Sequence, residues 1–188
     1  MSQNHNLKKL NEYQQLLLGF NKRFNLVSKL KTKNLEEDIQ DCLELIKLIP
    51  QQTKKILDLG SGNGFPGIVI AIIKPSLSID LAEKQNKKAH FLSIATRTLG
   101  LKNTKVIQKN IANNTDERYD LVVARAVATT EKILQMTQKI ILPQAKYLLM
   151  KGKEQKTQEE LVNIKKPYII HPYRLNTKER CIVEIFNQ

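Results

Sequence analysis

Between residues 55 and 67 the chain reads Lys55-Ile56-Leu57-Asp58-Leu59-Gly60-Ser61-Gly62-Asn63-Gly64-Phe65-Pro66-Gly67. A short apolar segment, typical of a buried strand, leads directly into a loop with three glycines at alternate positions. Glycine adopts positive φ readily and allows a ligand to approach the backbone closely. Ligands of open α/β sheets bind at the carboxyl ends of strands. The stretch therefore predicts an α/β fold with a ligand site at this loop.

The rest of the chain after this loop alternates short apolar segments with helical patterns. We expect strands at 55–59, 77–81, 105–108, 121–124 and 146–150, and helices at 66–73, 86–99, 130–141 and 155–164. Two apolar stretches, 168–175 and 180–186, predict a closing antiparallel pair at one edge. Such alternation is typical of a parallel sheet covered on both faces. The predicted fold is a doubly wound, Rossmann-like α/β fold with a mainly parallel, seven-stranded sheet.

Two further helices are expected before the glycine loop. Apolar residues recur at three- and four-residue steps over 7–18, which marks one stripe of an amphipathic helix. The segment 34–48 opens with Asn34 as an N-cap candidate, carries acids in its first turn and stops at Pro50. We predict that residues 1–50 form a helical cap within the same compact unit as the main domain, residues 51–188.

The composition favours a globular protein with a polyanionic partner. The chain has 188 residues and a formal net charge of +13, which suits the approach to a phosphate backbone. The alternative is a lysine-rich composition without functional meaning. The first residues lack the apolar core of a secretion signal, and the longest apolar run, 65–73, is too short to span a bilayer. We therefore expect a cytoplasmic protein, with no membrane partner and no metal site at its cysteines or histidines.

Two cofactors compete for the glycine loop. The triplet Gly62-x-Gly64-x-x-Gly67 satisfies the dinucleotide fingerprint, and Glu83 lies 19 residues after Gly64, near the expected ribose-binding acid of an NAD enzyme. Against NAD, Asp58 precedes the first glycine, where a carboxylate repels a pyrophosphate but attracts the ammonium and sulfonium of S-adenosylmethionine. The sequence favours S-adenosylmethionine, with an NAD-linked oxidoreductase as the alternative.

Both acids also have a simpler interpretation. Asp58 could cap a turn, and Glu83 could be a solvated acid before a basic helix. Glu83 follows the apolar segment 78–82, which favours a carboxylate that accepts hydrogen bonds from both ribose hydroxyls.

The chain also resembles the bacterial small-subunit rRNA guanine-N7 methyltransferases, the RsmG or GidB family. The resemblance covers nearly the whole chain and is carried by FNKRFNL at 20–26, DLGSGNGFPG at 58–67, FL at 91–92, RAVA at 125–128, KG at 151–152 and ER at 179–180. The Phe-Pro-Gly ending of the glycine segment, followed at this distance by Ala-Arg-Ala, is specific to that family.

This resemblance implies a class I S-adenosylmethionine-dependent methyltransferase that acts on guanine N7 in the 530 loop of 16S rRNA, as free rRNA or in the small ribosomal subunit. It implies cofactor contacts at Gly60, Phe65, Ile111, Ala112 and Arg125. Together with the residues argued above, the cofactor-binding candidates are Asp58, Gly60, Gly62, Gly64, Phe65, Glu83, Ile111, Ala112 and Arg125. The chain departs from the family pattern at 37–42, where Glu-Asp-Ile-Gln-Asp-Cys replaces Arg-His-Ile-x-Asp-Ser, and at 110–113, where Asn-Ile-Ala-Asn replaces an Arg-x-Glu-Glu stretch.

Three basic residues are the candidate catalytic residues. Guanine N7 has a free lone pair, so its methylation needs no general base and depends on orientation and fixed charge. Arg125 and Lys151 each follow an apolar strand segment, and Arg180 begins the last one. Each could instead be an ordinary surface cation. Lys151 could also belong to the lysine–acid tetrad of ribose methyltransferases, but Asp120 begins its strand and should point away from the site.

An RNA groove could run between two basic stretches near the cap. Their members are Lys22, Arg23, Lys29, Lys31, Lys33, Lys84, Lys87 and Lys88. The alternative is that these lysines are merely solvated. A non-catalytic RNA-binding protein that keeps only the fold is a further alternative. Nothing in the sequence indicates an obligate dimer, so we expect a monomer.

Overall fold

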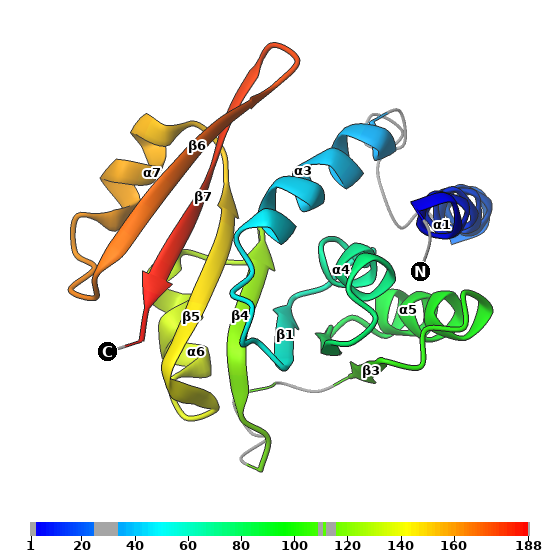
Figure 1. Ribbon diagram of the computed structural model, residues 1–188, viewed down its shortest axis with the longest axis horizontal. Coiled ribbons are helices and arrows are strands. Elements are labelled where there is room, and N and C mark those ends of the chain that lie inside the picture. Colours follow the sequence, from blue (N-terminus) through cyan, green and yellow to red (C-terminus); the bar gives the residue numbers. More distant parts are fainter. Residues whose placement is uncertain (1–2, 25–33, 109–110, 112–115, 188) are drawn as a thin grey trace.

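The structure, a computed structural model, describes residues 3–24, 34–108, 111 and 116–187. At its centre lies a seven-stranded sheet in the order β3-β2-β1-β4-β5-β7-β6 (Figure 1). The strands are β1 (Lys55–Leu59), β2 (Ser78–Ala82), β3 (Thr104–Ile107), β4 (Tyr119–Arg125), β5 (Ile141–Lys151), β6 (Tyr168–Leu175) and β7 (Lys178–Phe186). Strands β1 to β5 pair in parallel, whereas β7 pairs antiparallel with both β5 and β6. The predicted doubly wound, seven-stranded sheet is confirmed.

Helices cover both faces of this sheet. They are α1 (Gln3–Phe24), α3 (Leu35–Lys47), α4 (Gly67–Ile73), α5 (Asn86–Thr98), α6 (Thr130–Thr137) and α7 (Glu154–Leu161). Successive strand residues point to opposite faces, so Ile56 belongs to one hydrophobic cluster and Leu57 to the other. The first cluster includes side chains of α1, α3, α4 and α5, and the second includes side chains of α6 and α7.

The order of the strands fixes where a ligand can bind. After β1 the chain builds the sheet outward through β2 and β3, then returns to place β4 on the other side of β1. In open α/β sheets the crevice at the carboxyl ends of the strands, where the direction of building reverses, is the ligand site. Here the reversal lies between β1, which leads into the glycine loop, and β4, which ends at Arg125.

The two N-terminal helices pack against the same face as α4 and α5. Tyr13 and Leu17 of α1 and Leu45 of α3 are fully buried in the first cluster together with Ile68 of α4. Helix α1 extends beyond the predicted 7–18 at both ends. The division into a cap and a main domain stays a prediction, but both helices share their core with the sheet.

The predicted helix at 130–141 is wrong at its C-terminal end. Helix α6 stops at Thr137, and Ile141 already pairs with Tyr119 as the first residue of β5. Pro143 lacks the backbone N–H that a helix needs, and the apolar run before it extends the strand. Strand β5 is therefore 11 residues long, instead of the five predicted at 146–150.

Candidate active site

Glycine is required in the loop after β1 mainly because the protein itself fills the space. Gly60 and Gly64 have φ of 69° and 95°, which side chains rarely adopt. A Cβ at Gly60 would clash with the side chain of Val127, and one at Gly64 would lie 2.9 Å from the Tyr13 hydroxyl. At Gly62, with φ of 57°, the nearest atom to a Cβ is a loop carbonyl at 3.7 Å. The loop therefore leaves backbone open to a ligand at Gly62.

Asp58 lies beneath this loop and has no exposed surface. Its Oδ2 accepts a hydrogen bond of 3.0 Å from the backbone N–H of Gly67, whereas its Oδ1 has no hydrogen-bond partner among the residues that the structure describes. Burial raises the pKa of Asp58 to about 7. An unpaired carboxylate oxygen in the interior is costly, and a cation bound nearby would offset that cost. The carboxyl group thus fits the ammonium of S-adenosylmethionine, although it is less accessible than a surface acid would be.

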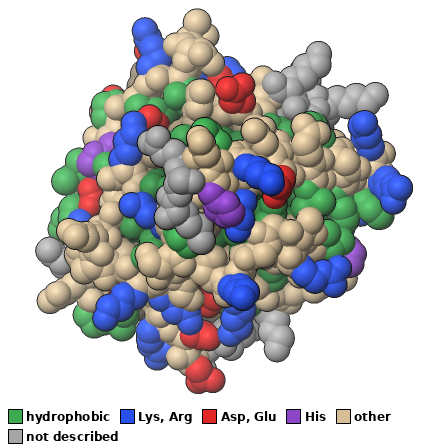
Figure 2. Space-filling view, turned by 45° about the vertical axis from the view of Figure 1, so that its right-hand side comes forward, with side chains coloured by type: hydrophobic (Ala, Val, Ile, Leu, Met, Phe, Trp, Pro, Cys, Tyr) green, Lys and Arg blue, Asp and Glu red, His purple; other side chains and the backbone are tan. Residues whose placement is uncertain are grey.

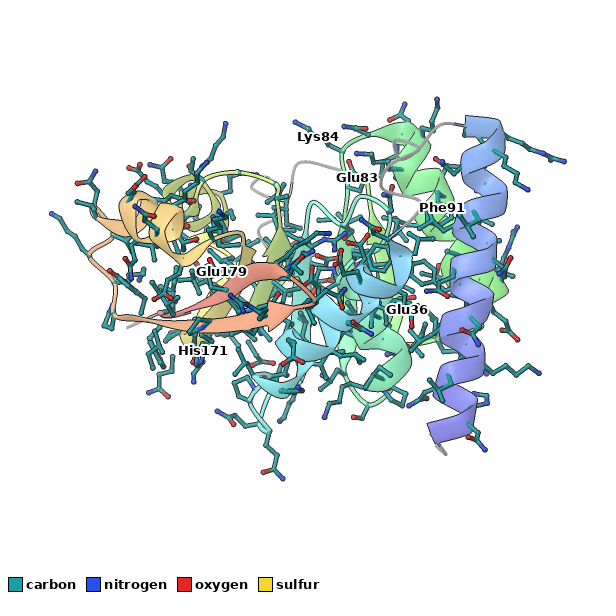
Figure 3. The ribbon with its side chains drawn as sticks, turned by 90° about the horizontal axis from the view of Figure 1, so that it is seen from above. Glu36, Glu83, Lys84, Phe91, His171 and Glu179 are labelled. Carbon is teal, nitrogen blue, oxygen red and sulfur yellow. The ribbon has the colours of Figure 1, made fainter. Side chains whose placement is uncertain are left out.

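Glu83 follows β2 and is nearly buried beside the loop (Figure 3). Its Oε2 accepts a hydrogen bond of 2.9 Å from the N–H of Gly62, and its Oε1 accepts one of 2.8 Å from the N–H of Gln85. A carboxylate has about four acceptor sites, so these two bonds fix its position and leave capacity for two ribose hydroxyls. The donor and acceptor set around the loop therefore fits an adenosine ribose.

Arg125 ends β4 on the other side of the crevice. Its Nη1 lies 2.8 Å from Oδ1 of Asp38 in α3, and its guanidinium carbon lies 5.0 Å from the centre of the Phe65 ring. The next residue, Ala126, has φ of 53°, a conformation that costs energy outside glycine and often occurs at functional sites. The guanidinium is thus held between the glycine loop and a cap helix.

Lys151 and Arg180 lie on the neighbouring strands at the same edge of the sheet. Arg125 pairs in register with Met150, the residue before Lys151, and Lys151 pairs with Cys181, the residue after Arg180. The structure therefore brings the three candidate catalytic residues into one row of backbone positions across β4, β5 and β7. Because successive strand residues face opposite sides, Arg125 and Arg180 point toward α3, whereas Lys151 points toward α7. A cleft of about 500 Å³ lies between Lys151 and the turn that leads into β7. A larger cleft, about 720 Å³, lies along α1 and the end of α5, far from this row.

Both of these cations already have acidic partners. Lys151 Nζ lies 2.7 Å from Oε1 of Glu160, and Arg180 pairs with Asp41 and with Glu37, the latter at 3.4 Å. Their charges are consequently neutralised locally. An anion that binds at this edge has to compete with carboxylates of α3 and α7.

The two remaining cofactor candidates follow β3. Ile111 is buried in the second hydrophobic cluster, which is compatible with a wall of an adenine pocket but leaves little of it exposed. Ala112 lies outside the described residues, so its contact with the cofactor stays a prediction.

The cap contributes two further residues to this site, Tyr13 and Asp38, that are not among the candidates predicted from the sequence. The sequence places Tyr13 in an apolar stripe of the first helix, and Asp38 where the family pattern has a basic residue. The signal for Tyr13 was present, because a buried tyrosine usually needs a partner for its hydroxyl, and it donates here to the carbonyl of Asn63 at 2.5 Å. For Asp38 only the three-dimensional packing shows the partner.

Comparison with known proteins identifies the family. A sequence model described as rRNA small subunit methyltransferase G matches residues 6–181. The chain belongs to this family. Among relatives named ribosomal RNA small subunit methyltransferase G, the one from Ruthia magnifica is 34% identical over 97% of this chain and 84% of its own length. The one from Brachyspira hyodysenteriae is 35% identical over 92% of this chain and 86% of its own length.

Solved methyltransferase structures share the fold of this family member. A methyltransferase from Pyrococcus furiosus superposes with a TM-score of 0.65 at 12% identity, covering 79% of this chain and 82% of that one. Precorrin-6y C5,15-methyltransferase from Geobacter metallireducens superposes with a TM-score of 0.61 at 14% identity, covering 86% and 91%. TrmK from M. capricolum, solved with S-adenosylhomocysteine, gives 0.60 at 14% identity over 78% and 67%. These similarities show the class I methyltransferase fold.

The basic stretches of this family member meet where α1 ends and α5 begins. Lys87 Nζ donates a hydrogen bond of 3.1 Å to the carbonyl of Phe24, which brings Lys22 and Arg23 near Lys84 and Lys88. Lys and Arg side chains are spread over the face shown in Figure 2, with fewer acidic ones among them. Lys29, Lys31 and Lys33 lie outside the described residues. None of the described helices is long and apolar enough to cross a membrane.

Proposed function

We propose that this protein transfers the methyl group of S-adenosylmethionine to N7 of a guanine in the 530 loop of 16S rRNA. Membership of the rRNA small subunit methyltransferase G family supports the reaction class and the substrate. The structural observation that carries the proposal is the position of Arg125 beside the glycine loop, with its guanidinium carbon 5.0 Å from the centre of the Phe65 ring. The choice of N7 and of the 530 loop follows from the resemblance of the glycine segment to that family.

The cofactor would lie along the carboxyl ends of β1 and β2. Glu83 would bind the ribose hydroxyls, the backbone at Gly62 would lie against the ligand, and Asp58 would face its ammonium group. The further contacts that we propose are with Gly60, Gly64, Phe65, Ile111, Ala112 and Arg125. When bound, S-adenosylmethionine supplies an electrophilic methyl group on a positively charged sulfur.

The side chains of the protein have only to orient the guanine and balance charge. N7 carries a lone pair and no proton, so no residue has to act as a general base. Arg125 could donate to guanine O6 or to a phosphate, and its planar guanidinium suits either acceptor. Arg180 would contact the RNA backbone once it displaces Asp41 and Glu37, and Lys151, on the other face of the sheet, once it displaces Glu160. Orientation and fixed charge are sufficient for such a transfer.

Three alternatives predict a different ligand, a different catalytic acid or a different activity. An NAD-linked oxidoreductase would bind NADH and not S-adenosylhomocysteine, so titration of both ligands by calorimetry separates the two classes. Asp120 accepts hydrogen bonds from the N–H groups of Lys54 and Lys55, at the amino end of β1, so it does not supply the acid of a ribose methyltransferase tetrad with Lys151. A non-catalytic RNA-binding protein would bind rRNA without transferring methyl groups.

The decisive experiment supplies small ribosomal subunits that lack the modification, together with labelled S-adenosylmethionine. Incorporation at N7 of one guanine in the 530 loop is expected, and mapping of the modified nucleotide checks it. Incorporation at another atom or nucleotide would refute the assigned target, and no incorporation by folded protein on subunits or free rRNA would favour the non-catalytic alternative. We also propose that the protein acts as a monomer in the cytoplasm, which light scattering of the purified protein tests for the oligomeric state.

Replacement of Arg125 tests the proposed row of basic residues. We expect Arg125→Ala to lower the methylation rate by about tenfold or more, because loss of orientation at a reacting centre has effects of this order. Arg97→Ala removes an exposed arginine of α5 and serves as the control. A wild-type rate for Arg125→Ala, in protein with an unchanged melting temperature, would show that the side chain has no part in the reaction.

A further inference from the structure

A continuous line of contacts runs from the two cap helices into the candidate active site. It begins at Asp38 of α3, passes through Arg125 and the Phe65 ring, and ends at Tyr13 of α1. The two cap helices thus touch both the glycine loop and Arg125.

The first part of this line fixes the Arg125 guanidinium. Its Nη1 donates a charge-assisted hydrogen bond of 2.8 Å to Asp38, and the guanidinium carbon lies 5.0 Å from the centre of the Phe65 ring. A planar guanidinium stacks well on aromatic rings and forms directional bonds with carboxylates. Only about a quarter of either charged side chain is exposed, 24% for Arg125 and 22% for Asp38. Two contacts in different directions therefore restrict both the position and the plane of this group.

The second part of this line of contacts, from Phe65 to Tyr13, fixes the glycine loop against helix α1. Tyr13 is fully buried, and its ring lies 5.2 Å from that of Phe65, centre to centre. Its hydroxyl donates a 2.5 Å hydrogen bond to the carbonyl of Asn63. Burial raises the pKa of the Tyr13 hydroxyl, so it remains a donor at neutral pH. The tyrosine consequently supports the loop at two successive places, the carbonyl of residue 63 and the ring of residue 65.

We infer that Tyr13 and Asp38 are positioning residues for methyl transfer: Asp38 orients Arg125 toward the substrate, and Tyr13 holds the glycine loop in its cofactor-binding shape. This inference deepens the proposed function and rests on the role proposed there for Arg125. It assigns part of the catalytic geometry to the N-terminal helices, which would otherwise be only a surface for RNA.

Replacement of Asp38 tests the first half of the inference. Asp38→Asn keeps the shape of the side chain and removes the charge that fixes Arg125, and we expect kcat/KM for methylation to fall about tenfold, within the range seen for misplaced catalytic groups. Glu36→Gln is the matched control, because Glu36 is an exposed acid two residues earlier in the same helix. Asp38→Glu keeps the charge and should restore part of the lost rate.

Combination with Arg125→Ala separates positioning from general destabilisation. If Asp38 acts through Arg125, then Asp38→Asn should have no further effect in the Arg125→Ala background, because effects of coupled residues are not additive. If the effects of Asp38→Asn and Arg125→Ala on the methylation rate multiplied in the double variant, the inference would be overturned. It would also be overturned if Asp38→Asn lowered the rate only in proportion to a lower melting temperature. If Asp38→Asn kept the wild-type methylation rate while Arg125→Ala lost it, this inference would be overturned and the proposed function would stay intact. A wild-type methylation rate in Arg125→Ala would remove the basis both of the role proposed for Arg125 and of this inference.

Replacement of Tyr13 tests the second half without any RNA. Tyr13→Phe removes only the hydroxyl, and we expect the dissociation constant for S-adenosylhomocysteine to rise about five- to tenfold, the effect of one lost hydrogen bond. Tyr168→Phe, in a half-exposed tyrosine of β6, is the control. An unchanged dissociation constant in folded Tyr13→Phe protein would show that the loop keeps its shape without this support.

Discussion

At the scale of single residues, Asp58 has the most unusual environment among the candidates. It is fully buried, one of its carboxyl oxygens has no hydrogen-bond partner within the described part of the chain, and its pKa is raised to about 7 by burial. The unfolded chain releases this proton at about pH 4, so the folded state holds one proton more between about pH 4 and 7. Linkage then requires the free energy of unfolding of the ligand-free protein to fall as pH rises through this window.

The affinity for the cofactor should show the opposite dependence on pH. A ligand ammonium near Asp58 favours the ionised form, and the ionised fraction rises roughly tenfold between pH 6 and pH 8 for a pKa of about 7. We therefore expect the affinity for S-adenosylhomocysteine to rise by up to about tenfold over this range, and to be nearly independent of pH in Asp58→Asn. Calorimetric titrations at several pH values check both. Equal affinity of the wild type at pH 6 and pH 8 would mean that the ligand and this carboxyl group do not interact.

At the scale of secondary-structure elements, Glu160 connects three of them. From α7 it accepts hydrogen bonds from Lys151 at the end of β5 and from the N–H of Thr130 at the start of α6, at 2.7 and 2.5 Å. Burial alone would raise the pKa of Glu160, but the hydrogen bonds from Lys151 and Thr130 lower it. A carboxylate with a lowered pKa stabilises the fold above its unfolded pKa, and this contribution is lost as pH falls through the folded pKa.

We expect Glu160→Gln to lower the free energy of unfolding at pH 7 by about 1 to 2 kcal/mol, the usual contribution of hydrogen bonds to a charged group. Urea denaturation measures it, with Glu159→Gln, an exposed neighbour in the same helix, as the control. The difference between wild type and Glu160→Gln should shrink below about pH 4. A difference that is independent of pH would mean that the side chain contributes through packing alone.

The same scale shows what the sequence could and could not predict. The strand before Gly60 and the helix that ends before Gly100 were predictable, because local signals define both. The end of α6 was not, because the apolar residues at 140–142 suit a helix face as well as a strand. Glu37 is predictable as a charge in the first turn of α3, but its partner Arg180 comes from a strand far along the chain. Such ion pairs depend on tertiary packing, which periodicity does not specify.

At the scale of the whole molecule, the net charge of +13 is the dominant feature. It is not concentrated in the candidate active site, where Lys151 and Arg180 are paired with acids. Basic residues lie instead at the end of α1 and just before and within the start of α5. One of them, Lys84, is exposed next to Glu83 (Figure 3). RNA binding should therefore begin on the cap side of the glycine loop.

We expect the logarithm of the association constant for rRNA to fall linearly with the logarithm of salt concentration, with a slope of about −0.7 to −0.9 for each phosphate contacted. Lys84→Gln should weaken binding and reduce the magnitude of this slope by about one contact. Lys74→Gln, an exposed lysine at the opposite end of α4, should leave the slope unchanged. Filter binding at several salt concentrations measures it, and equal slopes for both variants would place the RNA elsewhere.

The position of β7 between β5 and β6 has a consequence for how the chain acquires its structure. Strand β6 is joined to the sheet only through β7, although it precedes β7 in the chain. During synthesis, the long edge of β5 therefore stays uncovered until residues 178–186 have left the ribosome. Exposed strand edges are prone to pair with other chains, so premature termination before Lys178 would favour aggregation over a smaller but folded protein.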